Sequence, residues 1–203
     1  MTGGDDRRRC LAAGGIIGPL AFGAAWVACG RATVGYSAVT GAISELARVG
    51  ATTRPAMTLG FVAFGIGVPL YAVALRAAVP GPAWLAAFTC GVATLGVAAV
   101  PLGRGLDGWH GLCASLGYVA LAAVPALAAG PLRRAGWATA ATVSLVVAGL
   151  PAAALAATVT GVAHGAFQRL GLTLGDAWVM TSAVLILQGR TFNSAPEPVV
   201  PHR

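Results

Sequence analysis

Four side chains that could carry chemistry lie between long apolar stretches of this sequence: Glu45, Asp107, His110 and His164. Carboxylates and imidazoles bind divalent metals such as zinc, and they also act as general acids and bases. These residues come from three separate segments, so a fold that gathers the segments at one end could build a metal site with an open position for water. They could equally form a hydrogen-bond network that closes that end. No H-x-x-x-H or similar spacing favours the metal.

Glu45 lies in a segment that predicts a short helix. Val39, Ile43 and Leu46 recur there at helical spacing, which is typical of a helix lying on a bundle or in the membrane interface. Glu45 and Arg48 are three residues apart and would share one face of this helix. Two interpretations stay open: a surface ion pair, or a Glu45 carboxylate that serves as ligand or base over the mouth of a cavity.

Asp107 and His110 stand at the start of a later apolar stretch. Asp107 could accept the free amide hydrogens of the helix expected there, or it could orient the His110 ring by hydrogen bonding. The helix dipole disfavours the charged form of His110, and a neutral imidazole is a good metal ligand or general base. We therefore predict Glu45, Asp107 and His110 as candidate catalytic residues. The candidate metal ligands are His110, His164 and Asp107.

Long apolar stretches are the elements that must position these residues. Of 203 residues, 57% are hydrophobic and only 9% are charged, with a mean hydropathy of +0.80, whereas a soluble domain has about 25% charged residues. About 20 apolar residues cross the hydrocarbon core as a helix. The sequence therefore predicts an all-α fold, an integral membrane bundle of six transmembrane helices. The expected spans are residues 10–30, 55–75, 82–102, 110–130, 137–160 and 172–188.

Arginine positions predict the orientation of this bundle. Arginines gather at the cytoplasmic ends of spans, and the two clusters, Arg7–Arg9 and Arg133-Arg134, fall on the same side when six spans are counted. We expect both termini in the cytoplasm and a multi-pass protein of the bacterial plasma (inner) membrane. Residues 1–9 are then a cytoplasmic N-terminal arm, residues 10–190 the six-helix transmembrane domain, and residues 191–203 a disordered cytoplasmic tail.

The centres of the expected spans contain no charged residues. Asp176 lies inside the sixth expected span, but near its start. A charge at the bilayer centre costs at least ~2.5–3.5 kcal/mol, and proteins that relay protons or couple ions retain one. This pattern argues against a proton-coupled pump or a transporter with a midplane ionic site. In the first span, Gly14 and Gly18 form a small-xxx-small pair, which predicts close packing against another span of the same chain.

Four short motifs stand out along the chain. They are Ile43-Ser44-Glu45-Leu46, a span that ends Pro69-Leu70-Tyr71-Ala72-Val73-Ala74-Leu75-Arg76, the acid and histidine at Asp107 and His110, and Gln168-Arg169 followed by Trp178. Together they resemble the bacterial membrane family called domain of unknown function 998, over about residues 10–190. The resemblance implies six spans and no particular activity. It places Glu45, Asp107 and His110 among the first positions to test.

Three classes of function are compatible with these features. We favour an accessory membrane protein that contacts lipids or a partner, a second membrane protein or a second copy of the chain. The alternative is a membrane-embedded hydrolase, with or without a divalent metal, whose Glu, Asp and His side chains face outward. A facilitator for a small neutral or amphiphilic compound is the second alternative. The net charge of +7 comes from arginines scattered among apolar spans, so we expect no nucleic-acid partner.

Overall fold

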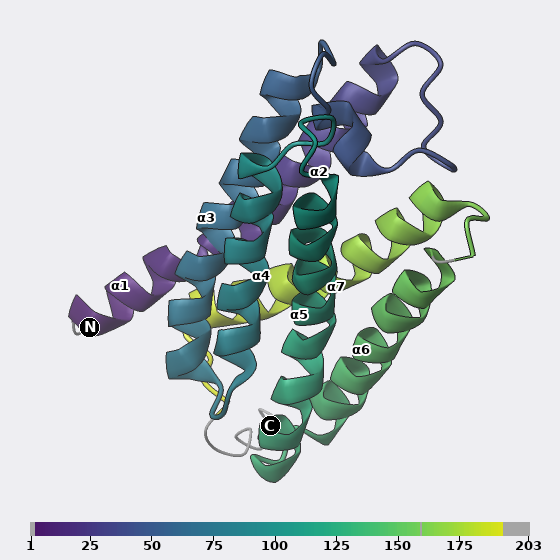
Figure 1. Cartoon of the computed structure of the whole chain (residues 1–203). Coiled ribbons are helices and arrows are strands. Elements are labelled where there is room, and N and C mark those ends of the chain that lie inside the picture. Colours follow the sequence, from purple (N-terminus) through teal and green to yellow (C-terminus); the bar gives the residue numbers. More distant parts are fainter. Residues whose placement is uncertain (1–2, 159, 193–203) are drawn as a thin grey trace.

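The computed structural model describes residues 3–158 and 160–192, and over these residues the chain is all-helical, as the sequence predicts. Its elements run consecutively through the bundle shown in Figure 1. They are α1 (Gly3–Ala12), α2 (Gly14–Ala32), the 3₁₀ helix η1 (Ile43–Ala47), α3 (Arg54–Ala78), α4 (Ala83–Ala99), α5 (Asp107–Arg134), α6 (Ala138–Thr158) and α7 (His164–Leu187).

Five helices in the described part are long and apolar enough to cross a membrane: Gly4–Ala32, which combines α1 and α2, and then α3, α5, α6 and α7. The apolar helix α4 is shorter, at 17 residues. Large apolar side chains such as Leu59, Val73 and Val146 are exposed on the outside of these helices. An apolar outer surface on several long helices is typical of a multi-pass membrane protein, because lipid rather than water covers that surface.

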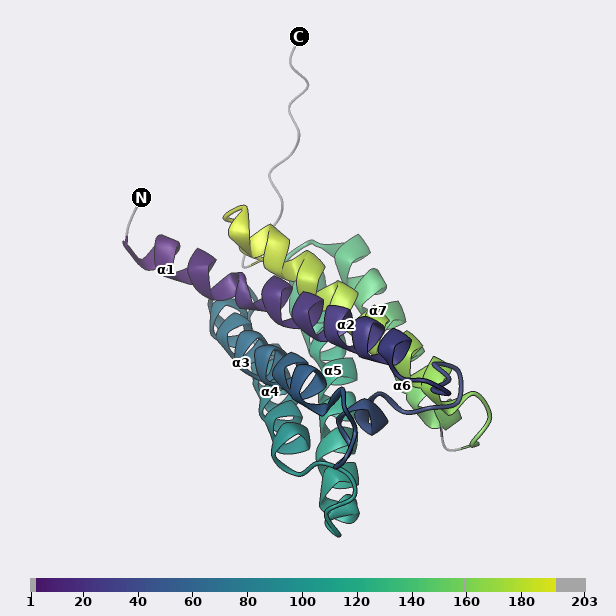
Figure 2. The same cartoon turned by 90° about the horizontal axis from the view of Figure 1, so that it is seen from above.

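Each helix from α2 to α7 packs on its neighbour in sequence, and α7 returns to contact α1 and α2, as Figure 2 shows. The chain leaving α7 meets the end of α3, where the Phe192 amide donates to the Ala78 carbonyl at 2.8 Å. At the opposite end lie residues 33–53, residues 100–106 and the first turns of α5 and α7. We call this the distal end. Every predicted site residue lies there.

Glycine allows α2 and α3 to approach closely. A Cβ atom on Gly14 would lie 2.3 Å from the carbonyl oxygen of Gly67, and one on Gly18 would lie 3.2 Å from the backbone of Ala63. At position 14 only glycine fits so short a separation between backbones, and at position 18 a larger residue would push the two helices slightly apart. The prediction that Gly14 and Gly18 pack against a span of the same chain is confirmed.

The last helix begins earlier than the sequence predicts. It starts at His164 instead of Leu172, so Asp176 is residue 13 of its 24 residues and lies at its middle. The prediction that span centres lack acidic residues was wrong, because polar side chains in the first turns of α7 resemble a loop in sequence. The predicted N-terminal arm is also helical, since α1 covers most of it and holds an Arg8–Asp5 ion pair at 3.3 Å. Of the predicted tail, residues 193–203 lie outside the described residues.

Candidate functional site

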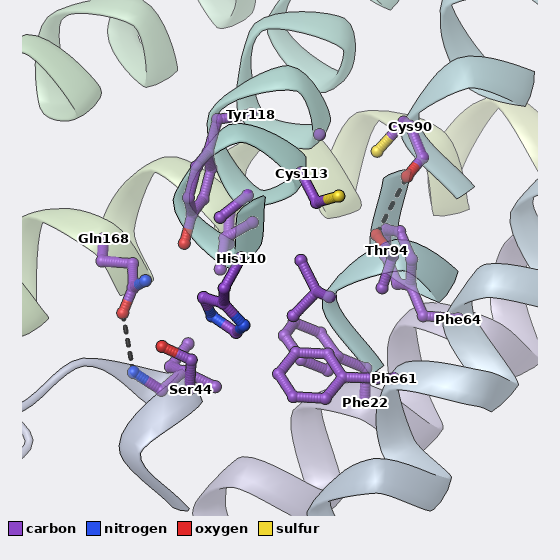
Figure 3. A pocket seen from close by; sticks show the side chains of 15 residues that line it. Phe22, Ser44, Phe61, Phe64, Cys90, Thr94, His110, Cys113, Tyr118 and Gln168 are labelled. Carbon is purple, nitrogen blue, oxygen red and sulfur yellow. Dashed lines mark hydrogen bonds between the residues drawn. The ribbon is translucent and has the colours of Figure 1, made fainter. Parts of the chain in front are cut away.

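A cavity of about 60 Å³ lies under the distal end. One water needs roughly 10–15 Å³ measured in this way, so the cavity could hold a few waters or the polar end of a small amphiphile. Most of its wall is apolar, and a few polar groups converge on it from η1, α4, α5 and α7 (Figure 3). Its apolar lining includes Phe22, Phe61, Phe64, Val97 and Leu172, and its polar lining includes Ser44, Thr94, His110, Tyr118 and Gln168.

His110 supplies the most distinctive polar atom of this cavity. The ring is buried, with 4% of the residue exposed, and its Nδ1 lies 2.7 Å from the carbonyl oxygen of Val100. A carbonyl oxygen only accepts hydrogen bonds, so Nδ1 carries a hydrogen, and in a neutral imidazole Nε2 is then the acceptor. The Nε2 atom is buried and has no hydrogen-bond partner. An unpaired buried acceptor beside a cavity is a place where a ligand can donate.

Asp107 has a different role from the two that the sequence suggests. Its Oδ1 accepts from the Gly103 amide at 2.8 Å, in the loop before α5. The N-cap residue of α5 is Leu106, and no side chain caps this helix end. Both predictions for Asp107 were wrong. Its carboxylate accepts a hydrogen bond from the Gly103 amide and does not cap the helix. The His110 ring, which Asp107 was expected to orient, instead forms its hydrogen bond with the Val100 carbonyl.

Glu45 and His164 also lie outside the cavity lining. Glu45 is exposed on η1, and the described residues contain no ion pair between Glu45 and Arg48. The Nδ1 of His164 lies 3.3 Å from the carbonyl oxygen of Thr158. Across residues 3–158 and 160–192, no three His, Cys, Asp or Glu side chains are close enough to hold a metal ion. Of the predicted site residues, therefore, only His110 lines the cavity.

Gln168 is a site residue whose role sequence analysis missed. Its Oε1 accepts from the Ile43 amide at 2.8 Å, which fastens η1 to α7 and places the neighbouring Ser44 at the cavity. Gln168 and Leu172 are four residues apart and line the same cavity from one face of α7. On α5, the helical spacing of His110, Ala114 and Gly117 likewise places all three on one face, and all three line the cavity. This shared period was a signal in the sequence, and it could be used only once α7 was known to begin at His164.

Asp176 is the second polar group that sequence analysis misplaced. It follows Leu172 by one turn on the same face of α7, and its Oδ1 is buried without a hydrogen-bond partner. An acidic residue at this depth of a span is rare and is the kind of residue that membrane proteins use functionally.

Long apolar helices define this molecule as a multi-pass helical membrane protein, and a small cavity with a largely apolar wall and a few polar groups lies near the distal end of its bundle. The model of the family described as "Protein of unknown function (DUF998)" matches residues 16–185 of the chain. The chain belongs to this family, which confirms the resemblance drawn from its motifs. No curated protein and no solved structure matches the chain.

Proposed function

We propose that this protein is an accessory protein of the bacterial plasma membrane that binds the polar end of a small amphiphile in its distal cavity. The single observation that carries the proposal is the buried Nε2 of His110, which has no partner. An unsatisfied buried acceptor costs about 1–3 kcal/mol, and a ligand hydroxyl or amine that donates to it would recover much of this cost.

The composition of the cavity supports an amphiphile over a sugar or an ion. Phe22, Phe61 and Phe64 form an apolar wall, and they face the few polar side chains shown in Figure 3. Ligand sites typically combine such a wall with a small number of polar groups that fix orientation. The hydroxyl of Thr94 already donates to the Cys90 carbonyl at 2.9 Å, whereas the buried Nε2 of His110 has no hydrogen-bond partner.

Six membrane crossings with both termini in the cytoplasm belong to this proposal. Helix α4 has 17 residues, which is at the lower limit of the ~17–25 that a crossing helix needs. It joins the end of α3 near the termini to the start of α5 at the distal end, and it packs against both helices. The arginine clusters support the cytoplasmic side for the end that carries the termini.

The test compares two lipids that differ in hydrogen-bond donors, 1-monooleoylglycerol and methyl oleate. Affinity for the purified full chain is measured from the ligand-dependent rise in thermal stability in detergent. We expect monooleoylglycerol to bind about fivefold more tightly, since one net hydrogen bond contributes about 1 kcal/mol. His110→Phe keeps a ring in the cavity but removes both nitrogens, so this preference should disappear.

Asp107→Asn is the matched control, because Asp107 is exposed three residues away and lies outside the cavity lining. This variant should keep the preference of the wild type. Equal affinities of the wild type for the two lipids, or a preference that survives in His110→Phe, would refute the proposal. The hydrolase and the facilitator stay predictions, since no observation on Glu45 or His164 favours either.

A further inference from the structure

Arg169 holds residues 33–53, which we call the distal loop, onto α7 and is the most deeply buried arginine at this end. Only 8% of the residue is exposed. Its Nη1 donates to the carbonyl oxygens of Ala38, Gly41 and Gly165 at 2.8, 3.0 and 2.9 Å, and its Nη2 donates to the Tyr36 hydroxyl. The Nε atom is buried and has no partner. Neutral acceptors therefore surround the guanidinium, and none of them cancels its charge.

A second cavity, of about 290 Å³, opens beside this guanidinium. Trp26 and Tyr36 form part of its wall, with the Arg169 guanidinium carbon 5.3 and 5.6 Å from their ring centres. Arg31, from the last turn of α2, lines the same cavity, and Val27 lies one turn before it on the same helix. Two arginines and an apolar aromatic wall thus share one cavity at the distal end.

Neither arginine has an acidic partner. Among the residues that the structure describes, the only ion pair within 4 Å is Arg8–Asp5, at the other end of the molecule. Glu45 influences Tyr36 electrostatically, but it forms no ion pair with Arg169 and does not line this cavity. A buried charge without a counter-charge is costly, and arginine cannot relieve that cost by losing its proton.

We propose that this second cavity binds the headgroup phosphate of an anionic phospholipid from the leaflet at the distal end. Arginine recognises phosphate oxygens with its planar fork of donors, and the exposed Arg31 can present such a fork to the headgroup. Arg169, whose Nη1 donates to three carbonyl oxygens, contributes its positive charge beside the cavity. A zwitterionic phosphatidylethanolamine carries an ammonium group that offsets the charge of its phosphate, so the two arginines attract this headgroup much less.

The surroundings of the cavity identify a lipid, and not free phosphate, as the source of the anion. Trp26 and Val27 belong to α2, which is part of the apolar segment Gly4–Ala32 that is long enough to cross the membrane. Tryptophan is enriched at the level of lipid headgroups. In this arrangement the acyl chains pack along the apolar surface of α2, and the phosphate lies beside Arg31 and Arg169. This site is separate from the His110 cavity and does not depend on its ligand.

The experiment measures binding of dioleoylphosphatidylglycerol and dioleoylphosphatidylethanolamine to the purified full chain by native mass spectrometry. We expect the anionic lipid to bind more tightly. Arg31→Gln should weaken its binding about fivefold, the effect of about one arginine near an anionic surface, and should leave phosphatidylethanolamine unaffected. Arg31 is exposed, so this variant changes no buried contact.

Arg104→Gln is the matched control, since Arg104 is an exposed arginine of the same end that lies outside the cavity. Equal weakening by Arg31→Gln and Arg104→Gln would overturn the proposal, because it would indicate attraction to the whole surface. Equal binding of the two lipids would also overturn it. Inorganic phosphate is the third probe: if millimolar phosphate displaces the lipid from the wild type but not from Arg31→Gln, the site is one for soluble phosphate and the lipid assignment fails.

Discussion

The hydroxyl oxygen of Tyr36 links the distal loop to α7, because it forms hydrogen bonds with both. It donates to the carbonyl oxygens of Gly41 and Ala42 at 3.1 and 2.9 Å and accepts from Arg169. Partial burial raises the pKa of this phenol above its ordinary value, and the Glu45 carboxylate adds to the rise, while the Arg169 guanidinium opposes it. Because burial is the largest of these effects, the folded protein binds the phenolic proton more tightly than the unfolded chain does.

A raised pKa of Tyr36 predicts loss of stability in alkali. Its contribution is complete below the unfolded value of about 10 and is lost as the pH rises through the folded value. We expect the thermal stability of the wild type in detergent to fall above about pH 10 more steeply than that of Tyr36→Phe. The Phe variant should also be less stable at neutral pH, since it lacks the hydroxyl bonds. Parallel curves for the two proteins would contradict this.

Single residues at the site were only partly predictable from the sequence. His110 could be found because an imidazole at the start of an apolar helix is unusual. The hydrogen-bond partners of Asp107 and His110 could not be predicted. These partners are the backbone amide of Gly103 and the backbone carbonyl of Val100, and the positions of backbone groups depend on the fold. Asp176 was misplaced because the start of its helix was misplaced.

Among the elements, the packing of the distal loop on α7 depends on one glycine. A Cβ atom on Gly165 would lie 2.3 Å from the Gly41 carbonyl oxygen and 2.8 Å from that of Ala38, two acceptors of the Arg169 guanidinium. These are backbone atoms, so the loop itself would have to move. Such contacts were invisible in the sequence, because residues 38–41 and 165 are far apart and only tertiary structure brings them together.

Gly165→Ala should therefore destabilise the protein by roughly 1–3 kcal/mol, the usual cost of overpacking. The matched control is Gly111→Ala in α5, where an added Cβ would meet nothing within 4 Å. Alanine favours a helix over glycine by up to about 1 kcal/mol, so this control should be neutral or stabilising. Unfolding by denaturant in detergent measures both changes. Equal effects of the two substitutions would show that helix propensity, and not the contact with the loop, decides the outcome.

For the whole molecule, hydropathy was sufficient to predict the class of fold. Apolar runs long enough to cross a membrane give helices whose backbone groups are satisfied within each segment, and the structure contains them. What hydropathy could not predict is the end of each helix. Gln168 and Arg169, in the first turns of α7, form hydrogen bonds with the loop that packs on them. A hydropathy average over neighbouring residues does not detect such tertiary contacts, so it places the start of the helix too late.

Orientation and the crossing of α4 can be tested together with two single cysteines in a chain whose four cysteines are replaced. Ala77→Cys is exposed near the end of α3, before α4, and Asp107→Cys is exposed at the start of α5, after it. A helix of 17 residues is roughly 25 Å long, close to the thickness of the hydrocarbon core. We expect a membrane-impermeant maleimide to label Asp107→Cys in intact cells and Ala77→Cys only after lysis. Labelling of both in intact cells would show that α4 does not cross, whereas the reversed pattern would place the termini outside and show that the arginine clusters mislead.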